Sequence, residues 1–361
     1  MDQTTFRILD KLSSNLGRDY SILSLTNELS GKDHKAYYKN IFDKIKELYK
    51  AGDIILKKIG NSSIISINFN NYDAVNLLSQ LELMKQRQLL EKDAELKMVL
   101  CELSGLFRLN FCYINSISVI RPEKNKALNR QEFLFILKEF GKNNDQAVKE
   151  EIIGIHRIMK ALANMHNMKL DCLILREAEF AQLLNEGAHN PLKEMISSQT
   201  VLTYGENYWL EIMKLSNEGI PISGAGEINP AKIDESEVIY NLALFGYKEL
   251  GGAIEKGRDY CMETIIISLF LSEDARRMEA IPIILNKNLE RGRKIIFNLL
   301  IFLALKYGKE RKLLGYLQYL NDHKKNDELA NAIALMTCIG IKPEKIDKKS
   351  IKQKLELYHG N

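Results

Sequence analysis

Glu132 and Asp171 are the carboxylates whose positions could support metal-dependent chemistry. They lie at the starts of two short apolar runs, 133 to 137 and 170 to 175, which are predicted to be strands. Carboxylate oxygens on neighbouring strands can hold Mg²⁺ against nucleotide phosphates. Arg130 stands beside them and offsets much of the charge that a metal needs. The residues alone therefore favour a structural role for Glu132 and Asp171, as strand-end carboxylates that pair with Arg121 or Arg130. No bound cofactor is expected.

Arg121 and Arg130 form a second candidate group. The strand predicted over residues 113 to 120 ends just before Arg121, so both guanidinium groups are expected near the ends of adjacent strands. Guanidinium groups bind phosphate oxygens in a bidentate manner. The hypothesis that follows is a nucleotide ligand that is bound at Arg121 and Arg130 without turnover.

Several other kinds of chemistry lack their motifs in this chain. There is no Gly-x-x-x-x-Gly-Lys-Ser/Thr loop, no Gly-x-Ser-x-Gly elbow and no His-Glu-x-x-His pair. The five cysteines are widely spaced, without a Cys-x-x-Cys, and are expected to be reduced core residues. The six histidines are scattered, and a structural role is expected for them. No metal site is predicted from these residue types.

The third candidate group lies on a basic helix that is predicted from His34 to Ala51, with Asp33 as its cap. A helix over 21 to 29 precedes it, and two strands, 54 to 58 and 64 to 69, follow it. Polar and aromatic side chains on such a helix and hairpin suit contacts with phosphates and base edges. The residues expected to contact DNA are Lys35, Tyr37, Tyr38, Lys39, Asn40, Lys44, Lys57, Lys58 and Asn61.

The stretch from residue 3 to 70 resembles the winged helix-turn-helix family. The resemblance rests on the apolar series Ile41, Ile45 and Leu48, followed by Ala51-Gly52-Asp53-Ile54, where the long helix ends at a glycine and leads into the wing. It implies that the second helix enters the major groove of double-stranded DNA. The same residues could form a module that only contacts proteins.

Residues 96 to 215 are similar to the small nucleotidyltransferase-fold domains that archaea often fuse to winged helices. The end of this stretch, through Tyr204-Gly205, carries the resemblance, because such domains tend to finish with an edge strand and a Tyr-Gly turn. The catalytic positions differ from the family pattern. Arg121-Pro122 stands where the family has Gly-Ser, and Arg130-Gln131-Glu132 stands where it has Asp-x-Asp. The resemblance therefore implies a degenerate, inactive domain.

Composition indicates an ordinary globular protein of several domains. The net charge of +4 is small, and residues 1 to 70 carry 11 Lys and Arg against 8 Asp and Glu, so nucleic-acid binding must depend on local clusters. The chain shows no signal-peptide pattern and no apolar run long enough to span a bilayer. A cytoplasmic protein without membrane partners is expected.

The predicted architecture is multidomain α+β. It comprises a winged helix (1–71), a linker helix with a nucleotidyltransferase-like α/β domain (72–218), a Gly- and Pro-containing linker (219–232) and an all-helical C-terminal domain (233–361). The favoured function is transcriptional regulation through binding of duplex DNA, with a homodimer supplying a second half-site. The alternatives are a Mg²⁺-dependent nucleotidyltransferase that uses Glu132 and Asp171, and a protein-interaction scaffold.

Overall fold

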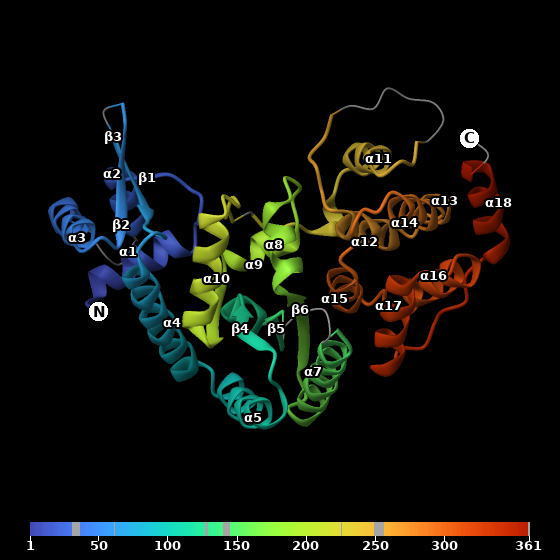
Figure 1. Cartoon of the computed structure of the whole chain (residues 1–361), viewed down its shortest axis with the longest axis horizontal. Helices are drawn as coiled ribbons and strands as arrows, with labels where there is room; N and C mark the ends of the chain where they lie inside the picture. Colours follow the sequence, from blue (N-terminus) through green and yellow to red (C-terminus); the bar gives the residue numbers. More distant parts are fainter. Residues whose placement is uncertain are drawn as a thin grey trace.

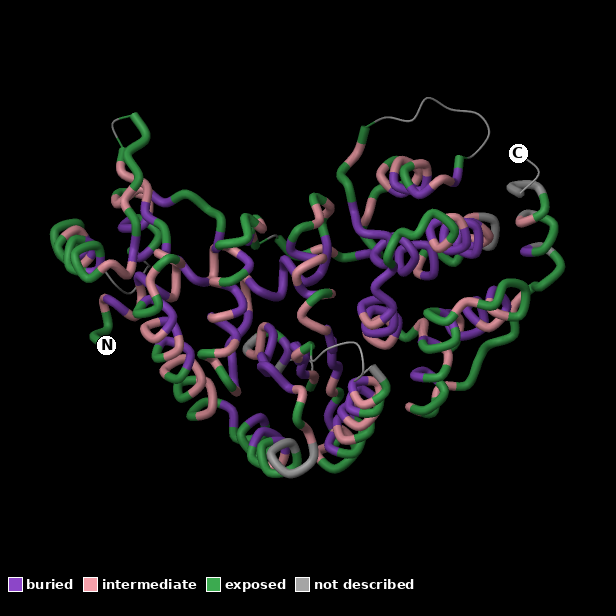
Figure 2. Tube along the Cα trace, viewed as in Figure 1, coloured by how far each residue is buried: buried purple, intermediate pink, exposed green. Residues whose placement is uncertain are grey.

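A computed structural model describes residues 1–30, 37–60, 62–126, 129–139, 145–224, 226–248 and 256–359. The fold is mixed α+β, with a three-stranded sheet near the N-terminus, a four-stranded sheet in the middle and helices toward the C-terminus. These parts follow one another from left to right in Figure 1. Figure 2 shows that buried segments continue from the central sheet into the C-terminal helices, so the two share packed surfaces.

The described residues of the N-terminal part contain three helices that precede a β-hairpin, and the second helix, the third helix and the hairpin follow the order that the sequence predicts. Its elements are α1 (Gln3–Ser13), β1 (Tyr20–Ser21), α2 (Ile22–Leu29), α3 (Tyr38–Ala51), β2 (Ile54–Ile59) and β3 (Ser62–Ile67). The strand order is β1-β3-β2, and the short β1 was not predicted. The predicted helix start at His34 and its cap Asp33 lie outside the described residues.

Local hydrogen bonds explain where these helices begin and end. The Asp2 carboxylate accepts from the Thr5 amide at 2.9 Å, and this bond lowers the pKa of Asp2 to about 2. Ser21 caps α2 in the same way, through the Ser24 amide at 3.0 Å. Helix α3 ends at Gly52, whose φ of 84° is the left-handed conformation that glycine adopts without steric cost.

The apolar pattern from residue 72 to about 104 predicts that the linker helix is one long helix. The structure has two helices there, α4 (Tyr72–Lys92) and α5 (Ala94–Asn110). Asp93 separates them, and its carboxylate accepts from the Leu96 amide at 3.0 Å, which caps the start of α5. The prediction of one continuous helix was wrong because the apolar pattern continues across a residue that can also act as a cap. Figure 1 shows α4 descending from the N-terminal sheet toward α5 below the central sheet.

The central sheet has the strand order β6-β5-β4-β7. Strands β5 and β6 are parallel, and β4 is antiparallel to both of its neighbours. The elements of this part are β4 (Ile114–Ile120), α6 (Pro122–Lys126), β5 (Arg130–Leu137), α7 (Asp145–Met165), β6 (Lys169–Arg176), α8 (Glu177–Asn185), α9 (Pro191–Ile196), β7 (Gln199–Thr203) and α10 (Gly205–Asn217). The predicted strands over 113 to 120, 133 to 137 and 170 to 175 are therefore confirmed with small changes at their ends, whereas α10 was missed.

The C-terminal region is helical, as predicted, but several predicted helices are shorter. They are α11 (Glu235–Leu244), α12 (Met262–Ser272), α13 (Ala275–Met278), α14 (Ala280–Glu290), α15 (Phe297–Tyr307), α16 (Glu310–His323), α17 (Asp327–Cys338) and α18 (Lys348–His359), after a short 3-10 turn η2 (Pro230–Lys232). Helical spacing over residues 254 to 271 predicts one helix, whose first two residues lie outside the described residues. The observed α12 starts only at Met262, because the backbone of Tyr260 pairs with His189 and donates to the Asn241 side chain. Pro282 stands inside an apolar helical pattern, which predicts a kink or a break there. In the structure it lies in the first turn of α14, and the break precedes that turn.

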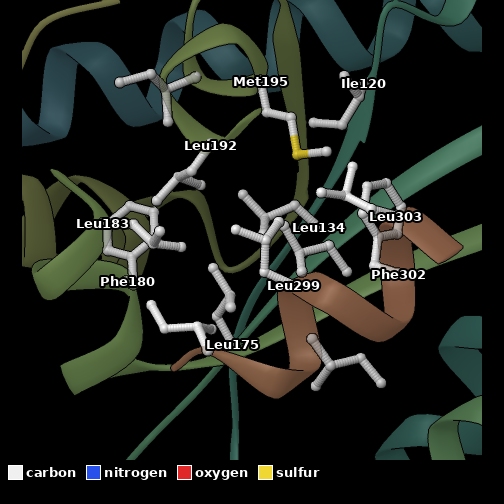
Figure 3. Close-up of a cluster of buried hydrophobic side chains, with 14 of the residues drawn as sticks. Ile120, Leu134, Leu175, Phe180, Leu183, Leu192, Met195, Leu299, Phe302 and Leu303 are labelled. Carbon is white, nitrogen blue, oxygen red and sulfur yellow. The ribbon is translucent and has the colours of Figure 1, made fainter. Parts of the chain in front are cut away.

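Helix α15 packs on the central sheet rather than only on other helices. Figure 3 shows its side chains Leu299, Phe302 and Leu303 meeting Leu134 and Leu175 of the sheet, with α8 and α9 alongside. All five of these side chains are almost completely buried. Burial of apolar side chains at such a contact stabilises it by about 1.5–3 kcal/mol for each residue. The packing fixes α15 against the sheet face that carries Glu132 and Asp171, since alternate residues of a strand share a face.

The described residues of the predicted linker, 219 to 224 and 226 to 232, form hydrogen bonds and ion pairs with other parts of the chain. The Gly224 amide donates to the Leu16 carbonyl at 3.2 Å, and the Ile228 amide donates to the Glu194 carboxylate at 2.5 Å. Glu227 forms ion pairs with Arg121 and Lys124. These contacts connect the segment to the N-terminal part at one end and to the central sheet at the other. Residues 219 to 232 are called the strap below.

Glu263, in the first turn of α12, gives a prediction about pH. Complete burial raises the pKa of Glu263 to about 7, although its carboxylate accepts from the Ile296 amide at 2.9 Å. Because this pKa is raised on folding, the stability present at low pH declines as pH rises toward and through 7. We expect Glu263→Gln to be about 1–3 kcal/mol more stable than the wild type at pH 8 and equal to it near pH 5. Chemical unfolding at both pH values measures this, and an unchanged difference contradicts it.

Candidate nucleic-acid interface and carboxylate cluster

The outer face of α3 is the first candidate site. Ile41, Ile45 and Leu48 are buried at helical spacing against α1, α2 and the hairpin. Their burial turns the remaining side chains toward solvent at the end of the molecule farthest from the C-terminal helices, as Figure 1 shows. The exposed residues of α3 are Tyr38, Lys39, Asn40, Asp43, Lys46, Glu47, Tyr49, Lys50 and Ala51.

The predicted DNA contacts are in different environments. Tyr37 is 65% exposed just before α3, and Lys39 and Asn40 are exposed in its first turn. Lys44 is partly buried and forms ion pairs with Asp2 and Glu47, so its charge is already balanced. Lys35 and Asn61 lie outside the described residues.

Lys57 and Lys58 are both exposed on β2, in the hairpin that projects beyond the helices in Figure 1. Among the described residues, no carboxylate pairs with either of them or with Lys39. The structure therefore leaves Lys39, Lys57 and Lys58 as cations whose charge is not balanced by a neighbour, which favours these three for contact with phosphates.

A side-chain ladder on α3 was missed by the sequence analysis. Tyr38 stacks on Phe42 with ring centroids 5.9 Å apart, and the Lys46 ammonium lies 4.3 Å from the centre of the Phe42 ring. The signal was the spacing of four between these residues, which places them one above another on a helix. The ladder holds an aromatic surface and a cation in fixed positions beside Lys39 and Asn40.

Glu132, Asp171 and Arg130 form the second candidate site. Glu132 of β5 and Asp171 of β6 are directly opposite each other in the parallel register. The Arg130 guanidinium lies between them, 2.7 Å from an Asp171 oxygen and 3.5 Å from a Glu132 oxygen. Both carboxylates are about 95% buried. The pairing with Arg130 that the residues alone favoured is present.

Lys306 completes the cluster from the other side. This residue of α15 reaches Glu132 with its ammonium 2.9 Å from the carboxylate. Burial raises the pKa of Asp171, while Arg130 and Lys169 act in the opposite direction. Arg130 and Lys306 thus form ion pairs with the carboxylate oxygens of Asp171 and Glu132, which are the oxygens that a Mg²⁺ ion would need as ligands. No group of three or more metal-ligating side chains occurs within the described ranges.

No family model, curated protein or solved structure matches this chain. The function must therefore be argued from the geometry of the two sites. In the part of the chain that the structure describes, no helix has the length and apolar character needed to cross a membrane.

Arg121, the other predicted phosphate ligand, also forms ion pairs with carboxylates. Its guanidinium lies 2.8 Å from Glu194 and 2.9 Å from Glu227. The backbone of Arg121 has a positive φ of 43°, and its amide donates to Ser198. Burial raises the pKa of Glu194 to about 7. Arg121 therefore ties β4 to α9 and to the strap, and a phosphate ligand would have to displace both carboxylates.

Proposed function

We propose that this protein binds duplex DNA through its N-terminal part, as a transcriptional regulator does. The observation that carries the proposal is the placement of α3, whose apolar side is buried while its first turn exposes Tyr38, Lys39 and Asn40. A helix of this kind fits a major groove about 12 Å wide. The β2–β3 hairpin then reaches the neighbouring backbone with Lys57 and Lys58.

The side chains of this surface divide by the contact they would make. Lysines bind phosphates without sequence preference, and amide side chains such as that of Asn40 bind the edge of adenine. Tyr37 and Tyr38 supply apolar and hydroxyl contacts at the groove. Lys44 contributes less than the sequence indicated, because Asp2 and Glu47 already balance its charge. A second copy of the chain would add a second half-site and so raise affinity.

Selection of bound sequences from a random duplex pool tests both binding and specificity. We expect enrichment of a short motif, and we expect Asn40→Ala to relax the preference at one position by about 1–3 kcal/mol. Lys325→Ala is the matched control, because Lys325 is an exposed residue far along the chain. A pool that stays unenriched, with a protein that is retained on no duplex, would favour a protein-interaction scaffold.

The alternative proposal is nucleotidyl transfer by Glu132 and Asp171 with Mg²⁺. The adjacency of the two carboxylates favours it, but the Arg130 and Lys306 cations and the packed helix α15 oppose it. We expect labelled ATP, GTP or CTP with Mg²⁺ to give no more transfer product with the wild type than with a Glu132→Gln, Asp171→Asn double variant. A product that the double variant loses would establish the enzyme and contradict this expectation.

A further inference from the structure

A cavity of about 760 Å³ lies between the central sheet and the C-terminal helices. One wall comes from α7 and β6, and the other comes from the end of α15, the start of α16 and residues 339 to 342 after α17. Cavities of roughly 300–1,000 Å³ are the usual size for small-molecule sites. The lining contains no residue of α3 or of the β2–β3 hairpin, so none of the proposed DNA contacts takes part in the cavity.

Basic side chains gather around this cavity from both walls. Those of the described lining residues are Lys160, Lys169, Arg311 and Lys342. The Lys160 ammonium donates to the Ile339 carbonyl at 3.1 Å. The Lys169 ammonium lies 3.4 Å from both the Leu305 and the Lys306 carbonyls and 3.9 Å from the Asp171 carboxylate. An ammonium group has three donors, so Lys160 keeps donors for a ligand after making its contact, whereas the donors of Lys169 are directed at three acceptors of the protein.

The acidic side chains of the lining do not balance these cations. They are Asp171 and Glu310, and Asp171 is held by Arg130 at 2.7 Å. Arg311 and Lys342 are exposed and have no ion-pair partner among the described residues. The cavity therefore has a net positive rim that attracts an anion.

Apart from His156 and Cys172, whose side chains lie 3.3 Å from each other, the remaining side chains of the lining are aliphatic or contain thioethers. Met159 and Met168 lie on one wall, and Leu305 and Ile341 lie on the other. The described lining contains no Phe, Tyr or Trp on which a nucleobase could stack. Methionine side chains adapt their shape to flexible apolar groups. This composition favours an aliphatic chain over a planar ring as the body of the ligand.

We propose that the cavity binds an aliphatic molecule with a carboxylate or phosphate head group. The head group lies at Arg311 and Lys342, where it makes charge-assisted hydrogen bonds, and the chain lies between Met159, Met168 and Leu305. The bound molecule contacts both walls and so holds residues 339 to 342 against α7. This binding is independent of DNA and is measured on the full chain alone.

Isothermal titration calorimetry with octanoate, octyl phosphate and neutral 1-octanol tests the proposal below the micellar concentration. We expect one or both anions to bind saturably and 1-octanol to bind at least about tenfold more weakly, because it cannot form charge-assisted bonds. The two anions distinguish a carboxylate head group from a phosphate head group. An Arg311→Gln, Lys342→Gln double variant should bind the anion at least about tenfold more weakly.

Two further variants separate binding in the cavity from nonspecific adsorption. Ala163 lines the cavity from α7, and Ala163→Phe should abolish binding by filling the space. Lys325→Gln, which removes an exposed cation outside the cavity, should leave binding unchanged. The double variant changes exposed residues only, so it remains informative if Ala163→Phe unfolds. Absence of saturable binding by both anions, or equal binding by the wild type and the double variant, overturns the proposal.

Discussion

Replacing Arg130 with methionine is expected to lower the free energy of unfolding of the central sheet by about 3 kcal/mol. Removal of one partner from a buried ion pair leaves an uncompensated charge and costs about 3–5 kcal/mol. The lower value is expected because Lys306 still contacts Glu132 at 2.9 Å. The single tryptophan, Trp209, is buried in α10 beside this sheet, so its fluorescence during urea unfolding reports the change.

The pH dependence and a control variant make this result specific to the cluster. Because burial raises the pKa of Asp171, the cost of its charged form is present above that pKa and declines as pH falls. The difference between Arg130→Met and the wild type should therefore be smaller at pH 5 than at pH 8. Arg87→Met, which breaks the exposed pair with Glu91, should change stability by no more than about 0.5 kcal/mol. Equal effects of the two variants would contradict the role given to Arg130.

Replacing Lys39, Lys57 and Lys58 together with alanine is expected to weaken binding to duplex DNA by about a hundredfold or more at low salt. Each lysine can form one charge-assisted contact with a phosphate, and three such contacts are lost. All three side chains are exposed, so the fold is preserved and circular dichroism should be unchanged. Fluorescence anisotropy with a labelled duplex of random sequence measures the affinity.

A second triple variant provides the control for charge alone. Lys325, Lys345 and Lys349 are exposed lysines of the C-terminal region, and their replacement with alanine removes the same net charge. Affinity should fall far less in this variant, because these residues lie away from α3 and the hairpin. Equal losses in the two variants would show that binding depends on overall charge and would contradict a specific interface.

The N-terminal part could be predicted from sequence because its signals are local. Gly52 ends α3 where only a left-handed residue fits, and the spacing of Ile41, Ile45 and Leu48 identifies the buried side of the helix. Alternation in residues 64 to 69 predicts the second hairpin strand, which the structure has as β3 (Ser62–Ile67). These features depend on neighbours within a few positions, so one sequence contains enough information to place them.

The carboxylate cluster could be predicted only in part. Its Arg130 partner is two residues from Glu132, but Lys306 comes from a helix 174 residues further along the chain. Nothing in the apolar pattern of α15 distinguishes a helix that packs on other helices from one that packs on a sheet. The covering of the sheet by Leu299 and Phe302 is therefore a tertiary result.

Two misplaced boundaries have a similar cause. The apolar pattern continues across Asp93 and so predicts one long helix, although the Asp93 side chain caps the start of α5. Helical spacing also predicts a helix over residues 256 to 261, yet Asn241 and His189 provide hydrogen-bond partners that hold Tyr260 and Cys261 in an extended backbone. In both cases a hydrogen bond overrode the helical propensity.

The most direct test of DNA binding is the salt dependence of affinity for a random-sequence duplex, measured by anisotropy from about 50 to 200 mM salt. Three phosphate contacts, from Lys39, Lys57 and Lys58, predict that log K falls with log salt with a slope of about −2.7 or steeper. The Lys39, Lys57 and Lys58 triple variant should have a slope that is shallower by about the same amount. A wild-type protein that shows no salt-sensitive retention of duplex DNA at the lowest salt would contradict the proposed function.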